Sequence, residues 1–350
     1  MTRQTWTAIV SAVCFVVLAM LLALLPVPFV AWGPGRTLNL LGEGDSGKPA
    51  VEVEGLKTHP VTGELRMTTV SVTRVDSKLS LPEALFAHAL PKRDVLARDV
   101  VYPPSKSLDQ VRTEEVAMMD DSKSEAIVAA LRAAGEKVQQ MPMVKSVGLA
   151  GPAYSRLQPG DLIERVDRTE VQRPADVARL IGRHAVGDPV VLSVLRDGRQ
   201  MDITVTTVSS NEDKKVPVIG VRTVEGYLYA PTVNFGIDPK VVGPSAGLVF
   251  SLAIYDMITP GDLLGGRKVA VTGQISADGT VSPIGGIQEK IAGAERAGAE
   301  YFLVPSGNCG DIGGVDSSMR LVKVGTMGEA VKALSDLRSG ASPESLPRCA

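Results

Sequence analysis

The sequence predicts an α+β protein with an N-terminal transmembrane helix, a small β-rich domain and a C-terminal domain of mixed helices and strands. Three observations support this prediction. Ile9 to Leu25 is almost purely apolar, residues 140–210 alternate short apolar runs with turn residues, and strand-like and helix-like segments interleave after Val216. With 350 residues, the chain is long enough for two or three domains that each bury a core.

The overall composition excludes some classes of protein. Charged residues make up 22% of the chain and hydrophobic residues 44%, which is typical of a globular rather than a disordered protein. The net charge is −2 and only 4% of residues are aromatic, so neither electrostatics nor base stacking favours a nucleic acid as partner. We therefore expect no nucleic-acid binding.

Residues 1–35 are expected to form a membrane anchor, with a helix over about residues 8–30. No side chain from Gln4 to Gly35 is charged, and Trp6 and Trp32 flank the apolar run as aromatic residues do at membrane interfaces. At ~1.5 Å per residue this run can cross a ~30 Å hydrocarbon core as a helix. The alternative is a cleaved signal peptide, whose apolar region would be shorter and would lead to a small-residue cleavage site rather than Pro26-Val-Pro28.

The side of the membrane follows from how little precedes the helix. Only two residues precede Arg3, so the bulk of the chain follows the helix, and we expect a single-pass protein of the cell membrane with this bulk on the extracytoplasmic side. Cys309 and Cys349 would then lie where disulfides form, and we expect them to pair. Two unrelated thiols are the alternative. Cys14 falls in the apolar run and is expected only to pack there.

Residues 36–120 are expected to form a linker and a β-rich segment to which the sequence assigns no role. Turn formers dominate residues 36–50. The β-rich runs 50–56 and 65–75 are separated by a proline and a glycine and suggest a hairpin. Residues 81–90 and 122–134 have helical composition.

Residues 121–210 resemble a PDZ domain of the type found in secreted bacterial proteases. The resemblance rests on Gly151-Pro-Ala153 and on Leu157-Gln-Pro-Gly160-Asp161-Leu-Ile163, followed by a short helix over 174–181 and a hairpin around Asp197-Gly198. PDZ domains bind extended chain ends along a sheet edge. The resemblance implies a peptide site near Gly151, Pro152 and Ala153. A small β domain without a ligand is the alternative.

Two motif matches near the N-terminus are contradicted by the residues around them. Residues 42–48 fit the start of a phosphate-binding loop, but Pro49 replaces the Ser or Thr that would bind magnesium, and no strand precedes the loop. Gly44-Asp-Ser46-Gly47 matches the nucleophile loop of chymotrypsin-like proteases, yet the first histidine of the chain, His59, follows it. We expect no nucleotide, no cofactor and no metal.

A third match, Gly243-Pro-Ser245-Ala-Gly247, has the G-x-S-x-G form of a hydrolase nucleophile. In the α/β-hydrolase order the catalytic histidine follows the serine, whereas all three histidines of this chain precede it. A nucleophilic Ser245 therefore needs another base. The alternative is that proline and serine simply begin a helix, although such a helix start also places free backbone N–H groups beside the serine.

Lysine can act as that base when its pKa is low enough to leave neutral amine. Lys290 follows Pro283-Ile-Gly-Gly286, close to the expected start of a helix, where burial and the helix dipole both disfavour a cation. The alternative for any single lysine on a helix is an exposed, solvated side chain.

Taken together, residues 216–340 resemble the proteolytic domain of Lon-type proteases. Four ordered blocks carry the resemblance: Gly243-Pro-Ser-Ala-Gly247, Val271-Thr-Gly-Gln-Ile275, Pro283-Ile-Gly-Gly-Ile-Gln-Glu-Lys290, and Ala294-Glu-Arg-Ala-Gly298 with Val304-Pro305. The resemblance implies that Ser245 is the nucleophile, that Lys290 is the general base and that Thr272 orients the amine. Gly243 and Ala246 are expected to support the serine from either side.

The chain also departs from ATP-dependent Lon proteases. Val242 stands where those members usually carry an acid, and an anchor and a PDZ-like domain replace the ATPase module. The arrangement resembles membrane-bound, ATP-independent Lon-like proteases of bacteria. It implies an endopeptidase that cuts extended or unfolded polypeptides and assembles into a homo-oligomeric ring. Two other functions stay open: a membrane-anchored PDZ scaffold with a silent Lon-like domain, and an esterase that uses the same pair.

Overall fold

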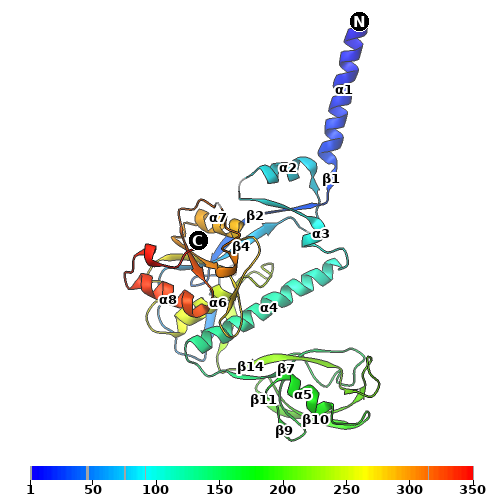
Figure 1. Ribbon diagram of the computed structural model, residues 1–350, viewed down its shortest axis with the longest axis vertical. Coiled ribbons are helices and arrows are strands. Elements are labelled where there is room, and N and C mark those ends of the chain that lie inside the picture. Colours follow the sequence, from blue (N-terminus) through cyan, green and yellow to red (C-terminus); the bar gives the residue numbers. More distant parts are fainter. Residues whose placement is uncertain (1, 45–46, 75, 91, 314, 350) are drawn as a thin grey trace. The chain divides into compact units, whose positions relative to one another are not determined.

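The computed structural model describes residues 2–44, 47–74, 76–90, 92–313 and 315–349, and it divides into two compact units (Figure 1). The first unit comprises the chain up to Gly135 and from Pro231 onward. The second unit, Glu136–Ala230, is inserted between these two stretches. Each unit has its own core.

The chain begins with helix α1, Arg3–Leu24, none of whose residues is buried. The helix has 22 residues and contains an 18-residue window with a mean hydropathy of 2.7, and among the described residues it is the one helix long and apolar enough to cross a membrane. Both ends of this helix lie earlier in the chain than the expected bounds of 8–30. Thr2 caps the helix, and Pro26 and Pro28 turn the chain into strands β1, Pro26–Val27, and β2, Phe29–Asn39.

A six-stranded sheet forms the centre of the first unit. Its order is β20-β19-β16-β4-β2-β6, in which β4, β16, β19 and β20 run parallel, whereas β2 is antiparallel to both β4 and β6. The remaining bounds are β4 Glu64–Val72, β6 Asp94–Ala97, β16 Lys268–Val271, β19 Tyr301–Pro305 and β20 Arg320–Val324. Strands β4 and β6 therefore come from the segment that the sequence left without a role, and most of β2 comes from the end of the expected membrane anchor, residues 1–35.

The hairpin expected from residues 50–56 and 65–75 is wrong, and Val75 lies outside the described residues. Strand β3, Val51–Glu54, pairs with the distant β15, Thr232–Phe235. Strand β4 instead buries Leu65 and Met67, each 1% exposed, between β2 and β16. Burial of these side chains outweighs the local preference for a hairpin, because a two-stranded hairpin alone has no core to bury them in.

The expected linker over 36–50 is also partly wrong, since β2 extends to Asn39. Of the segment that resembled a phosphate-binding loop, Asp45 and Ser46 lie outside the described residues. The flanking residues form a bridge between Glu43 and Pro49 and lead into strand β3, not into the helix whose N-terminus would hold phosphate.

Helices complete the first unit. The apolar helix α6, Gly247–Ile258, is almost entirely buried, and α4, Leu108–Ala133, packs along it (Figure 1). The expected helix 122–134 is only the second half of α4, because its first half is too polar to show an apolar stripe. The other elements are α2 Leu81–Ala89, α3 Arg98–Val101, α7 Ile287–Arg296, α8 Met327–Arg338, β5 Leu79–Ser80, β17 Gln274–Ile275, β18 Val281–Ser282, and the 3₁₀ turns Ser306–Asn308 and Pro343–Ser345.

The second unit is a small sheet with one helix. Its strand order is β11-β10-β8-β7-β14, and Val177, Leu180 and Ile181 of helix α5, Pro174–Ile181, are buried in its core. Asp197 and Gly198 both have positive φ, as the tight hairpin between β10 and β11 requires. The bounds are β7 Gln139–Val147, β8 Leu162–Val166, β9 Thr169–Glu170, β10 Pro189–Arg196, β11 Arg199–Thr206, β12 Val208–Ser209, β13 Pro217–Val218 and β14 Val221–Leu228.

Strand β14 corrects the expected boundary at residue 216. The sequence suggested two strands, 216–221 and 226–231, at the start of the C-terminal domain. The structure has the short β13, Pro217–Val218, which pairs with β12, and then one strand over Val221–Leu228, which pairs with β7 along its whole length. Both strands belong to the second unit.

Candidate active site

Ser245 lies in a short loop that α4 and the end of β16 hold in place. Gly243, whose φ of +94° favours glycine, donates its N–H to the Glu115 carbonyl at 3.2 Å. The Ser122 Oγ donates to the Pro244 carbonyl at 3.0 Å. The helix expected from Gly243 begins only at Gly247. The loop is thus fixed by hydrogen bonds on both sides of its proline.

Lys290 approaches this serine from the first turn of α7. Its Nζ donates to Ser245 Oγ at 2.6 Å and to Thr272 Oγ1 at 3.0 Å. Thr272 Oγ1 in turn donates to the Ser245 carbonyl at 3.2 Å. The three side chains that the Lon-type resemblance singled out, 45 residues apart at the extremes, therefore meet in one hydrogen-bonded group.

Burial sets the protonation state of Lys290. Its side chain is 2% exposed, and this loss of water lowers its pKa from the ordinary 10.5 to about 7. Near neutral pH a large share of the amine is therefore unprotonated and able to accept a proton from a hydroxyl. The exposed, solvated lysine that was the alternative does not occur here.

Glycines at the start of α7 allow this burial. Gly286 caps the helix in a left-handed conformation with φ of +69°. A Cβ at this position would lie 2.6 Å from the Cγ1 of Val70 on β4 and 3.3 Å from the ring of Trp32 on β2. The missing side chain lets α7 press Lys290 against the sheet.

A pocket of about 710 Å³ opens beside the Ser245 and Lys290 side chains. One wall is largely apolar and comes from residues 32–102: Trp32, Met67, Val70, Val72, Val101 and Tyr102. Charged residues line another part: Arg36, which forms an ion pair with Asp238, together with Lys240 and Glu115. Burial raises the pKa of Glu115. None of the three histidines, all of them described, lines the pocket.

The sequence suggested that Trp32 flanks the apolar run at a membrane interface, but the structure places it in the sheet beside Ser245. It lies in β2, half-buried, and lines the pocket. The prolines that end α1 early direct this residue into the sheet instead.

Backbone donors stand next to the serine. Within the part of the chain that the structure describes, the N–H groups of Ser245 and Ala246 find no acceptor, although Ala246 is 5% exposed. Such unpaired donors at a helix start can bind a developing oxyanion. The Gly243 N–H is not available, because it already donates to Glu115.

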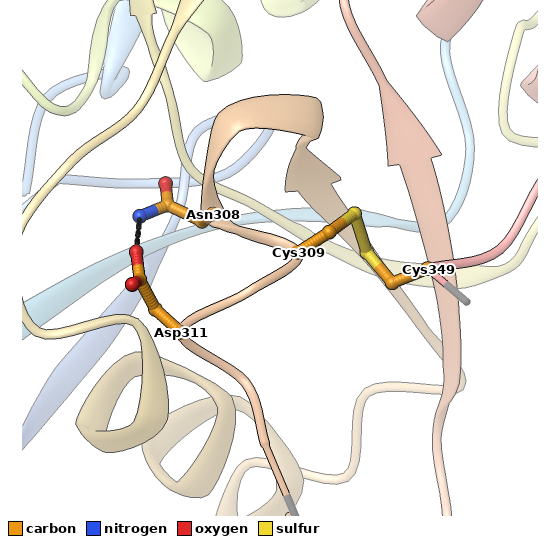
Figure 2. The surroundings of a disulfide bond; sticks show 4 residues. All are labelled: Asn308, Cys309, Asp311 and Cys349. Carbon is orange, nitrogen blue, oxygen red and sulfur yellow. Dashed lines mark hydrogen bonds between the residues drawn. A yellow bond between two sulfur atoms is a disulfide. The ribbon is translucent and has the colours of Figure 1, made fainter.

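The loop after β19 supports the start of α7. The structure joins Cys309 to Cys349 in a disulfide, with Cα atoms 5.1 Å apart, the pair expected from the sequence (Figure 2). Its neighbour Asn308, 1% exposed, bonds both the N–H and the carbonyl of Ile284 at 2.9 Å, and its Nδ2 also donates to Asp311. Ile284 lies just before α7, so this loop fixes the backbone that leads to Lys290.

In the second unit, the three residues expected near a peptide site lie beside the start of β14. The Ala153 N–H donates to the Ile219 carbonyl at 3.2 Å, and Gly151 packs against Gly220. Ala153 itself is fully buried, so a peptide could reach only its neighbours. Sequence reasoning missed Gly220 and β14, because about 70 residues separate them from Gly151 and no local signal links the two.

Strand β14 is the outermost strand of its sheet, and helix α5 packs next to it. An open strand edge beside a helix is the kind of surface to which an extended peptide adds as a further strand.

Comparisons with known proteins agree with this division of the chain. Residues 230–335 match the family described as the Lon protease (S16) C-terminal proteolytic domain, and residues 120–207 match the PDZ domain family. The chain therefore carries a Lon-type proteolytic domain and a PDZ domain, as the sequence predicted.

Individual relatives match over part of their length. Lon protease 1 of Sorangium cellulosum is 40% identical over 142 residues, which cover 38% of this chain and 16% of the relative. The Lon protease of Rhizobium meliloti is 30% identical over 132 residues, covering 32% and 16%. The chain thus spans about a sixth of these relatives. The solved PDZ domain of an SdrC-like protein from Listeria innocua is 23% identical with a TM-score of 0.22, covering 24% of this chain and 92% of that one.

Proposed function

We propose, from the presence of a Lon-type proteolytic domain, that this chain is a serine endopeptidase in which Ser245 is the nucleophile and Lys290 the general base. The observation that carries the proposal is the 2.6 Å contact between Lys290 Nζ and Ser245 Oγ, made by a lysine that is buried and whose pKa is lowered to about 7. A nucleophile within hydrogen-bond reach of a base that a third group orients is the arrangement that activates a hydroxyl.

In the first step, neutral Lys290 takes the proton from Ser245 Oγ while that oxygen forms a bond to the scissile carbonyl carbon. The carbonyl oxygen becomes an oxyanion, which the Ala246 N–H is placed to bind. As the C–N bond breaks, Lys290 returns the proton to the leaving amine and an acyl-enzyme forms. A water molecule then attacks the ester, Lys290 accepts its proton, and the proton passes back to Ser245 Oγ as the acid leaves. Thr272 holds Nζ in line throughout.

Substrates are proposed to be extended or unfolded polypeptides. The pocket beside Ser245 has an apolar wall that suits the side chains of an extended chain, and the β14 edge of the second unit could hold an extended segment as an added strand. The segment that resembled a phosphate-binding loop leads into a strand, which supports cleavage without ATP.

The location is proposed from α1 together with the cysteine pair. Helix α1 would anchor the protein in the cell membrane, and a disulfide between Cys309 and Cys349 fits an oxidising, extracytoplasmic compartment. Ring assembly, implied by the resemblance to Lon-type proteases, is a further proposal that light scattering of the purified protein tests.

The test is a peptidase assay on the full chain in detergent, comparing wild type with Ser245→Ala, Lys290→Ala and the double variant. Because the pair acts as a unit, each single variant should lose about as much activity as the double. Adding ATP and magnesium should leave the rate unchanged. Near-full turnover by Lys290→Ala would contradict the assignment of the base.

A silent scaffold would show no cleavage and no labelling of Ser245 by a serine-reactive probe, although its PDZ domain would still bind peptides. An esterase would hydrolyse an activated ester but not the matched amide. The same preparation therefore separates all three functions.

A further inference from the structure

Two short helices are tied to the first residues that follow α1. Strand β1 pairs with β5, the strand directly before α2, with Pro26 opposite Ser80 and Val27 opposite Leu79. The Leu81 N–H, at the start of α2, donates to the Leu25 carbonyl at 3.1 Å. At the start of α3, the Arg98 N–H donates to the Pro28 carbonyl at 2.9 Å. Figure 1 shows α2 and α3 on either side of β1 at the base of α1. Any membrane that α1 crosses therefore ends close to α2 and α3.

Helix α2 turns its large apolar side chains away from the protein core and toward the solvent. The residues that it buries in the protein are Ala84 and Ala87. Leu85 and Phe86 point outward and are 60% and 66% exposed. An amphipathic helix on a soluble surface normally shows the opposite arrangement, with its large apolar residues turned to the core.

Helix α3 carries another exposed large apolar residue. Val100 is 74% exposed, whereas its neighbour Val101 turns inward and lines the pocket beside Ser245. We refer to Leu85, Phe86 and Val100 as the bilayer-facing surface. Large apolar side chains gathered on exposed elements usually mark a contact with another protein or a membrane.

We propose that this bilayer-facing surface rests in the headgroup region of the membrane that α1 crosses, and that the enzyme consequently cuts polypeptide segments as they leave that same membrane. The proposal rests on the proposed function for its second part. The occupant is a bilayer because the backbone bonds at Leu25 and Pro28 hold both helices at the point where the chain leaves α1.

Charge does not drive this contact. Basic and acidic residues nearly balance in the described segments around α2 and α3: the bases are Arg74, Lys78, Lys92, Arg93 and Arg98, and the acids are Asp76, Glu83, Asp94 and Asp99. Insertion of apolar side chains is therefore the source of the contact, and neutral phosphatidylcholine should suffice.

Two neighbouring pockets lie between this surface and the nucleophile. A pocket of about 370 Å³ lies along α2, where Phe86 and Ala87 line it. Trp32 and Val72 line this pocket and also the larger one that holds Ser245 and Lys290. An extended segment that emerges beside α2 could thus pass Trp32 and reach Ser245, which is why we assign membrane-emergent segments as the substrate class.

The membrane contact is tested by fluorescence quenching of the full chain in phosphatidylcholine vesicles with brominated acyl chains. Trp6 and Trp32 are replaced by Phe, and Phe86→Trp is compared with Lys332→Trp, a matched exposed site on α8 whose side chain is 74% exposed. We expect bromine to quench the tryptophan at 86 at least threefold more than the one at 332. Equal quenching at the two sites would overturn the membrane contact. The contact would also be overturned if the tryptophan at 86 became protected from solvent in detergent as the protein concentration increased, because a second copy would then cover the surface.

The substrate class is tested with two substrates that share one cleavage sequence, a soluble peptide and the same peptide attached to a transmembrane helix in the vesicles. The variant Leu85→Glu with Val100→Glu should cleave the attached substrate about tenfold more slowly and the soluble peptide at the wild-type rate. The matched control, Val116→Glu with Met118→Glu on the exposed face of α4, should change neither rate.

Two other results have distinct meanings. If the double variant cut both substrates at the wild-type rate, or slowed both equally, the assigned substrate class would be wrong. If wild type cut neither substrate, while site 86 was still quenched, the proposed function would fail and the membrane contact would stand.

Discussion

Lys290 can act as a base only when it is unprotonated, so the rate of peptide cleavage should follow its titration. With a pKa of about 7, the neutral fraction is about 9% at pH 6, about 50% at pH 7 and about 91% at pH 8. Cleavage at low substrate concentration should therefore rise about tenfold between pH 6 and pH 8 and then level off. A lysine with the ordinary pKa of 10.5 would give no plateau, because its neutral fraction would still rise about tenfold per pH unit at pH 9.

The assay is the initial rate of cleavage of a quenched fluorescent peptide by the full chain, measured from pH 5 to pH 10 at constant ionic strength. Glu115 also lines the pocket, and burial raises its pKa, so Glu115→Gln is the control. It should leave the midpoint near pH 7 unchanged. A rate that keeps rising to pH 10, or a midpoint that moves with Glu115→Gln, would refute the assignment of the titration to a buried Lys290.

Three further predictions concern stability and positioning. Between pH 7 and pH 10.5 the unfolded chain binds a proton at Lys290 that the folded chain does not, so the contribution of Lys290 to stability increases with pH across that window. Lys290→Met removes this penalty and should raise the free energy of unfolding at pH 7 by a few kcal/mol, at about 1.4 kcal/mol per pKa unit. The same variant should abolish cleavage. Urea unfolding at pH 7 and pH 10 measures the stability change, and a destabilised Lys290→Met variant would contradict this prediction. Ser122→Ala should lower kcat about tenfold with little change in KM, whereas Ser124→Ala, an exposed serine on the same helix, should change neither; equal effects would remove the positioning role. Replacing Cys309 and Cys349 by serine should cost up to about 4 kcal/mol of unfolding free energy for a 40-residue separation, and two free thiols by intact mass in protein from an oxidising compartment would show that no bridge forms.

The chemistry of the site could be predicted further than its surroundings. Ser245, Thr272 and Lys290 stand in compact sequence motifs, and the absence of a histidine after the serine left lysine as the base. The resemblance to Lon-type proteases, which the ordered blocks carry, implied that these three side chains lie together. The donors to the nucleophile loop could not be predicted, because Ser122 is one polar residue in a long polar helix and nothing near it in the sequence points to Pro244.

The fold was harder to predict in the first hundred residues. Of the three strands from this region, only β4 was predicted as a β-rich segment, whereas β2 was expected to be anchor and linker and β6 was not predicted. Strand partners are set by burial across the whole sheet, and local patterns carry no information about a partner some 200 residues away. The same limit explains β14, whose partner β7 lies about 80 residues earlier. Helix α1 was recognised from composition, yet its end was set by two prolines.

These first residues matter for the chemistry. The proteolytic-domain match covers residues 230–335, but the burial that lowers the pKa of Lys290 also depends on Trp32 and Val70, which stand against the glycines at the start of α7. Antiparallel pairing of β4 with β2, in which Val70 lies opposite Pro34, holds Val70 in that position. Strand β16, the other neighbour of β4, leads directly to Thr272. The low pKa of Lys290 is therefore a property of the whole first unit. Since β2 follows α1 after only a few residues, the segment that leaves the proposed membrane span contributes Trp32 to the apolar wall beside Ser245.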